Sequence, residues 1–223
     1  MSKRLLTVLG GTKKQAQSVV FNGSNTRITA GTEASIDDLP LGDFTVELWI
    51  KTTKLTGQFL VGKAVNNVSG WFCYPDNRPQ VTGYYDDGNL DVYGTVASLS
   101  DGEWHHYAVT HTLSEKKYRL FLDGILQVAS NAASGNYVSD AASNLTFGSA
   151  IGGALLGSMG WIRISNSLRY TGNYIIPSRF IYPIVDANTV RLFKLNEGTG
   201  TTIVDHSTNA QNATLTNGIW ELN

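Results

Sequence analysis

A chain of 223 residues with a net charge of -1 is long enough to bury one sizeable core, and its near-neutral balance gives no reason to expect nucleic acid or an anionic membrane as a partner. No apolar run approaches the length that spans a bilayer, and the single cysteine, Cys73, excludes an intrachain disulfide. The Leu5–Leu9 run is too short for the apolar part of a signal peptide, so we expect synthesis and retention in a cytoplasm.

The first seventeen residues form a basic segment with little apolar content. Its charged residues are all basic and comprise Lys3, Arg4, Lys13 and Lys14. A short arm of this kind becomes ordered when it docks on a neighbouring chain. We therefore predict an N-terminal arm over residues 1–17 that binds a partner through these four side chains, followed by a single domain over residues 18–223.

Short apolar and β-branched runs, each bounded by turn residues, follow one another along the rest of the chain and predict an all-β protein. The expected strands are Ser18–Phe21, Thr26–Thr29, Phe44–Thr52, Gln58–Val65, Gly70–Tyr74, Leu90–Tyr93, Trp104–Thr110, Tyr118–Leu122, Ile125–Ala129, Leu145–Gly148, Met159–Ser165, Thr189–Lys194 and Gly218–Leu222. Residues 32–39 fit either one or two helical turns or a polar connection. Strict alternation in Phe44–Thr52 predicts a strand with one buried face.

The most legible element is a hairpin around Asp123-Gly124. Two apolar runs separated by Asp-Gly indicate a two-residue turn in which both central residues have positive φ. This turn predicts the pairs Leu122–Ile125, Phe121–Leu126 and Arg119–Val128. Because both faces of the hairpin carry apolar residues, we expect it inside a two-layer structure.

Six pieces of the chain together resemble the laminin-G-like and concanavalin A-like superfamily. They are Phe21-Asn22-Gly23-Ser24, Phe44–Ile50, Gly102–Thr110, Leu120–Gly124, Gly157–Ile164 and Arg191–Gly200 with Asp205. The resemblance implies a concanavalin A-like antiparallel β-sandwich, or jelly roll. The Glu-Gly-x-Gly piece often comes first in relatives but lies near the C-terminus here, which is a tolerable permutation because the two chain ends lie side by side in this fold.

A further piece, Leu168–Tyr174 followed by Pro177, is similar to a tail on such domains in structural proteins of tailed bacteriophages. This resemblance implies a non-enzymatic virion protein, without a cofactor, that decorates the capsid or the tail surface. Its partners would be other virion proteins in an oligomeric assembly. Its expected location is the virion surface after synthesis in the host cytoplasm.

The alternative function is a lectin-like module that binds a host-surface glycan. Sugar rings stack on exposed aromatic side chains beside planar polar groups. The candidate residues in the richest stretch are Trp71, Tyr74, Arg78, Tyr84, Tyr85 and Tyr93, and a second aromatic stretch contains Tyr170, Tyr174, Phe180 and Tyr182. The competing interpretation is that half of these rings are core and the others line a protein contact.

Enzymatic and metal sites are weakly indicated. Relatives that hydrolyse β-glucans place two glutamates and an aspartate at alternate positions of one strand, and no such stretch occurs here. His105 and His106 face opposite sides of a strand, which favours structural roles over chelation. Family calcium sites often have acids just before Ile162-Arg163, where this chain has Gly160-Trp161. The remaining calcium candidates are Asp205, Asn209 and Asn212.

Overall fold

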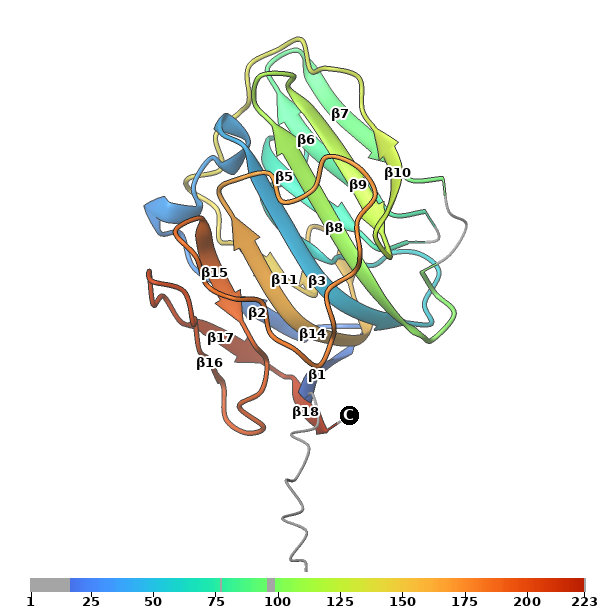
Figure 1. Ribbon diagram of the computed structural model, residues 1–223, viewed down its shortest axis with the longest axis vertical. Coiled ribbons are helices and arrows are strands. Elements are labelled where there is room, and N and C mark those ends of the chain that lie inside the picture. The colour runs from blue at the N-terminus through green and yellow to red at the C-terminus, as the bar shows by residue number, and fades with distance from the viewer. Residues whose placement is uncertain (1–16, 77, 96–98, 223) are drawn as a thin grey trace, which may run out of the picture.

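The computed structural model describes residues 17–76, 78–95 and 99–222 and forms a sandwich of two antiparallel sheets (Figure 1). Each sheet has eight strands within the described residues. The two inner faces meet in one large cluster of buried apolar side chains, contributed by both sheets. The jelly-roll architecture expected from the sequence is therefore confirmed, whereas the four basic residues of the predicted arm lie outside the described residues.

The first sheet has the order β10-β9-β8-β3-β14-β1-β18, and β15 also pairs with β14. Its strands are β1 (Gln17–Asn22), β3 (Phe44–Thr52), β8 (Trp104–Thr112), β9 (Lys117–Leu122), β10 (Ile125–Ala129), β14 (Leu156–Ser165), β15 (Thr189–Phe193) and β18 (Ile219–Leu222). We call it sheet A. Strands from both ends of the chain, β1 and β18, are neighbours in it, which supports the permutation inferred from the position of the Glu-Gly-x-Gly piece.

The second sheet, sheet B, has the order β16-β17-β2-β11-β4-β5-β6-β7. Its strands are β2 (Arg27–Thr29), β4 (Val61–Val65), β5 (Ser69–Tyr74), β6 (Gln80–Tyr85), β7 (Gly88–Tyr93), β11 (Thr146–Phe147), β16 (Thr202–Ile203) and β17 (Ala213–Thr216). A small ribbon, β12 (Ser149–Ala150) with β13 (Gly153–Ala154), lies outside both sheets. The sequence did not indicate β16 or β17, because both lie in a stretch whose composition is typical of a polar loop.

The connection between β2 and β3 contains two 3-10 turns, η1 (Ala34–Ile36) and η2 (Leu39–Leu41). This settles the choice left open by the sequence in favour of helical turns. No helix among the described residues has the length and apolar character needed to cross a bilayer.

The Asp123-Gly124 hairpin forms as expected at its turn and departs from expectation further along. Asp123 and Gly124 both have positive φ, and Leu122 pairs with Ile125 and Phe121 with Leu126. The third predicted pair is wrong, because the register shifts between Leu126 and Val128 and Val128 faces Leu120. A bulge of this kind adds one residue to one strand, and alternation alone does not reveal it.

Strand β3 is buried on both faces, not on the one face that its alternation predicted. Val46 and Leu48 lie in the core as expected, but Glu47 is also fully buried and Trp49 is only 6% exposed. Residues 166–188, which we call the strap, cover the outer face. In Figure 1 this orange segment leaves the end of β14 and crosses in front of β3, β8 and β9. The amide of Tyr174 donates to Gly124 at the far side of its path.

Candidate functional site

The strap is fastened to sheet A by a buried polar cluster centred on Glu47. The Arg163 guanidinium lies 2.5 Å from Glu47 Oε1, and the hydroxyl of Tyr170, on the strap, donates to Oε2 at 2.8 Å. His106 Nε2 lies 3.2 Å from the same Oε2, and its Nδ1 is 2.9 Å from the hydroxyl of Tyr174. Burial alone would raise the pKa of Glu47, but His106 and Arg163 outweigh it and hold the pKa below its ordinary value.

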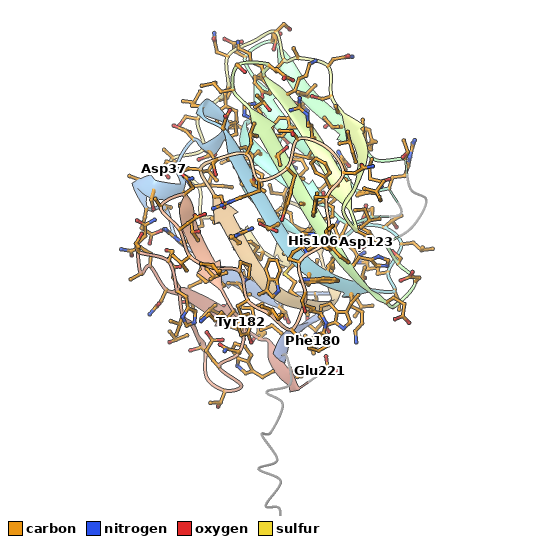
Figure 2. All side chains as sticks on the ribbon, viewed as in Figure 1. Asp37, His106, Asp123, Phe180, Tyr182 and Glu221 are labelled. Carbon is orange, nitrogen blue, oxygen red and sulfur yellow. The ribbon has the colours of Figure 1, made fainter. Side chains whose placement is uncertain are left out.

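Where the strap returns across sheet A, it forms one wall of an open groove of about 460 Å³. We call it the strap groove. Its lining comprises Trp49 and Trp104 from the sheet and Ile176, Pro177, Ser178, Arg179 and Phe180 from the strap. Phe180 is 61% exposed, and Figure 2 shows it on the front of the molecule with Tyr182 and Glu221 nearby. The groove is therefore an accessible aromatic site.

A cation and two aromatic rings form a stack inside this groove. The Arg179 guanidinium lies 4.4 Å from the ring centre of Trp104 and 4.5 Å from that of Phe180. The ammonium of Lys51 lies 5.4 Å from the same Trp104 ring. Burial lowers the pKa of the Arg179 guanidinium, but an arginine keeps its charge in proteins. Two positive charges therefore border the aromatic surface.

A bulge in β14 makes room for the groove. Met159 pairs with Ile50 and Ile162 with Leu48, so Gly160 and Trp161 together oppose Trp49. A Cβ at Gly160 would lie 3.0 Å from that of Trp49 and 3.8 Å from a ring atom of Trp104, so glycine leaves the space in which the two indoles meet. Bulges are common beside functional sites because they redirect side chains. The two positions before Ile162-Arg163 are often acidic in the family. In this chain they are Gly160 and Trp161, and this dipeptide helps to form the groove.

Three of the six candidate glycan residues in the stretch 71–93 are buried. Trp71 is fully buried between the sheets and packs against Phe44, and Tyr85 is also buried. Tyr84 is buried in a small cluster with Phe59 and Phe72 on the other face of sheet B. Trp71 and Tyr85 belong to the core and Tyr84 to this second cluster, so these three rings offer no face to a sugar.

Three members of that prediction remain accessible. Tyr74 is half-buried and donates to the carbonyl of Ile151, whereas Arg78 and Tyr93 are exposed near one end of β6 and β7. In the second aromatic stretch, Tyr170 and Tyr174 stack on each other with ring centres 3.5 Å apart and serve to hold the strap. Phe180 is the residue of that stretch that enters the strap groove.

Residues 22–169 match the model of the concanavalin A-like lectin/glucanases superfamily. The chain belongs to this superfamily. No curated protein matches the sequence.

Solved structures share the superfamily's sandwich with this chain. A Bacteroides ovatus protein proposed to bind carbohydrate aligns with a TM-score of 0.68 and 16% identity, over 94% of this chain and 60% of its own. The CBM40 module of a Ruminococcus gnavus sialidase aligns with a TM-score of 0.51 and 15% identity, over 69% of this chain and 93% of its own. Mouse laminin α1 domains LG4-5 align with a TM-score of 0.54 and 15% identity, over 67% of this chain and 42% of their own. At these identities the likeness shows the fold, and this chain spans 60% of the Bacteroides protein.

The calcium candidates of this superfamily member are occupied by contacts within the chain. Asp205 accepts from the amides of Leu192, Ser207 and Gln211. The side-chain amide of Asn209 donates to Val190, and that of Asn212 accepts from the Asp205 amide. The predicted donors thus shape a loop beside β15. The described residues hold no group of three or more histidine, cysteine or acidic side chains that suits a metal ion.

The histidines have separate structural contacts. His106 belongs to the Glu47 cluster, and His111 contacts the carbonyl of Gly42 and stacks on Phe44. His105 lies between two carboxylates, with Nδ1 2.7 Å from Asp123 and Nε2 3.0 Å from Asp101. The hydrogen bond with Asp123 is the largest cause that raises the pKa of His105 to about 9, and Asp101 adds to it against the effect of burial.

This raised pKa predicts a pH-dependent stability. The imidazolium form favours the folded state, so its contribution is fully present below the unfolded value of about 6.5 and is lost as pH rises toward 9. We expect the urea midpoint of the native protein to fall between pH 7 and pH 9.5 by more than that of His105→Gln. Parallel slopes of midpoint against pH for the two proteins would contradict the assignment.

Proposed function

We propose that this protein is a non-enzymatic carbohydrate-binding module and that the strap groove is its glycan site. The observation that carries the proposal is the accessible groove in which Trp49, Trp104 and Phe180 meet beside the Arg179 guanidinium. Apolar ring faces next to a few convergent polar groups are the surface on which pyranose rings bind. The Bacteroides ovatus protein and the CBM40 module, which share the fold, support the same class of ligand.

The chemistry of the groove supports the non-enzymatic part of this proposal. Glycoside hydrolysis needs two carboxyl groups on either side of the scissile bond. Neither the strap groove nor two further pockets in the described residues are lined by an aspartate or a glutamate. Glu47 lies near the groove, but it is fully buried and bound to Arg163 and Tyr170. It therefore has no free oxygen for a sugar.

Trp104→Ala tests the site. The substitution removes the half-buried ring on which the sugar is expected to stack, and we expect glycan affinity to fall at least about tenfold, the effect of losing a central aromatic contact. A glycan array with the native protein identifies a ligand, and calorimetry with that ligand then compares the variants. Urea unfolding of each variant establishes that the sandwich is intact.

Tyr93→Ala is the matched control, because Tyr93 is exposed on the edge strand β7 of the other sheet. It is expected to keep native affinity. If Tyr93→Ala abolishes binding and Trp104→Ala does not, the glycan site lies on sheet B. An array without any saturable ligand counts against carbohydrate binding altogether.

The virion role expected from the Leu168–Tyr174 segment stays a second candidate. It is favoured by a run of exposed apolar side chains on the strap, among them Ile175, Ile181 and Ile184, which are 96%, 71% and 85% exposed. Such a surface is typical of a protein contact. The segment that carried the resemblance has a role within the chain, since Tyr170 and Tyr174 hold the strap on sheet A. The location on a virion stays a prediction as well.

A further inference from the structure

Two buried N–H donors at the strap groove have no partner among the described residues. They are Trp49 Nε1 and Arg179 Nη1. The neighbouring indole of Trp161 shows the ordinary situation, because its Nε1 donates to the Ser178 carbonyl at 3.2 Å. Leaving a buried donor unpaired is unfavourable, because the group has lost its hydrogen bonds to water without replacing them. Because Trp49 and Arg179 both line the groove, a ligand bound there that carries acceptor oxygens can pair with both donors once the side chains adjust to expose their N–H groups.

The charge around the groove indicates the sign of that ligand. Among the described residues, neither Arg179 nor Lys51 forms an ion pair, and both lie against the Trp104 ring. The acid that acts on Arg179 is Glu221, whose carboxylate is already the acceptor for the hydroxyls of Ser18 and Ser158. A site with two cations and no lining carboxylate favours an anion.

The apolar lining indicates that this anion is part of a larger molecule. Ile176, Pro177 and Phe180 form the strap side of the groove, and the indoles of Trp49 and Trp104 form the sheet side. A bare inorganic anion has no surface to place against these groups. A sugar ring that bears a carboxylate has both parts, since its C–H face packs on the aromatic rings and its carboxylate pairs with a guanidinium.

Resting on the proposed function, we propose that the strap groove selects acidic sugars, such as a hexuronate or a sialic acid. Arg179 Nη1 donates to the sugar carboxylate and Trp49 Nε1 donates to a carboxylate or hydroxyl oxygen of the same ring. The ammonium of Lys51, which also lies against the Trp104 ring, adds a second positive charge. The apolar side chains of the strap position the ring so that both donors reach it.

The test compares acidic and neutral sugars on the native protein and on Arg179→Gln. The probes are the methyl glycosides of sialic acid and glucuronic acid, with methyl galactoside and methyl glucoside as neutral partners. We expect the native protein to bind at least one acidic probe at least about tenfold more tightly than its neutral partner, and Arg179→Gln to lose that preference. Raising the salt concentration should weaken acidic binding and leave neutral binding unchanged.

Arg27→Gln is the matched control, because Arg27 is an exposed arginine on β2 of sheet B, away from the groove. It is expected to retain the native preference. Saturable neutral-sugar binding that Trp104→Ala abolishes, without any acidic preference or any effect of Arg179→Gln, overturns the acidic selectivity and leaves the proposed function standing. No binding of any sugar overturns both. Arg179-dependent binding of inorganic phosphate or of vesicles containing phosphatidylserine, with no sugar bound, also overturns both.

Discussion

Replacing Glu47 with alanine is expected to lower the free energy of unfolding by about 3–5 kcal/mol, the loss seen when one partner of a buried ion pair is removed. The Glu47 side chain is fully buried, it accepts hydrogen bonds from Arg163 and Tyr170, and its Oε2 lies 3.2 Å from His106 Nε2. Without it, the largely buried guanidinium of Arg163 and the hydroxyl of the half-buried Tyr170 lose their partner. Urea unfolding monitored by tryptophan fluorescence measures the loss.

The same variant is expected to release the strap. Tyr170 and Tyr174 are held over β3 and β8 through Glu47 and His106, so trypsin should cleave after Arg169 or Arg179 much faster in Glu47→Ala than in the native protein. The matched control is Glu115→Ala. Glu115 also lies 2.6 Å from an arginine, Arg119, but its side chain is 44% exposed. An exposed pair of this kind contributes at most about 1 kcal/mol, so the control should unfold close to the native midpoint.

The dependence of stability on pH below neutrality is a second test of the Glu47 cluster. Because the pKa of Glu47 is lowered in the folded state, its stabilising contribution is present above the unfolded value of about 4.3 and is lost as pH falls through the folded value. The stability difference between the native protein and Glu47→Ala should therefore shrink below pH 4. A loss under about 1 kcal/mol at neutral pH, with the strap still protected from trypsin, would contradict the central role of Glu47.

These expectations connect the cluster to the proposed glycan site. Glu47 and Trp49 are two residues apart on β3 and therefore lie on the same outer face of the strand. The strap that Glu47 holds supplies Arg179 and Phe180 to the groove. In Figure 2, His106 and Asp123 lie side by side on this face, where the His106 amide donates to Asp123 at 2.8 Å. The strap therefore serves as a wall of the site, and a variant that releases it should also lose glycan binding.

The sandwich was predictable because alternation and turn chemistry are local. Phe44–Thr52 has the bounds expected from its pattern, and the positive φ of Asp123 and Gly124 follows from the residue types. The bulge at residues 126–128 was not predictable, because one extra residue changes the register without any distinctive residue type. The same applies to the bulge that brings Gly160 and Trp161 opposite Trp49.

The groove was only partly predictable. The sequence placed Trp49 on the face of β3 opposite to the core, which is correct, and singled out Phe180 as one of several aromatic candidates. It did not indicate that the strap would return over that face, so Trp104 and Arg179 were not connected. In the stretch of residues 71–93 the alternation places Trp71 and Cys73 on the core side, whereas aromatic content alone suggested a surface.

Lys63→Met is expected to destabilise the protein by about 3–5 kcal/mol at neutral pH, because it leaves a buried carboxylate without its counter-ion. Lys63 lies on the side of β4 that carries Val61, and its side chain is fully buried. Its ammonium is 2.9 Å from Asp37, which Figure 2 labels, and 3.2 Å from Asp140, and it donates to the Asp140 carbonyl at 2.7 Å. Lys63 thus ties the β2–β3 connection to the loop before β11.

The loss should depend on pH through Asp140. Burial raises the pKa of Asp140, against the hydrogen bond from Tyr137 and the charge of Lys63, and removing Lys63 takes away part of that opposition. A carboxyl whose folded pKa is raised binds its proton more readily in the folded state, so falling pH favours folding. Lys63→Met should therefore lose less stability at pH 5 than at pH 8, as measured by urea unfolding at both values.

Two further variants identify the buried charge as the cause. Asp140→Asn in the Lys63→Met background neutralises the unpaired carboxylate, so it should recover part of the lost stability and remove the pH dependence. Lys117 is the half-buried first residue of β9, so Lys117→Met makes the same chemical change away from a buried acid and should stay within about 0.5 kcal/mol of the native protein. Equal losses for Lys63→Met at pH 5 and pH 8, unchanged by Asp140→Asn, would place the effect in packing of the lysine stem and not in the ion pair.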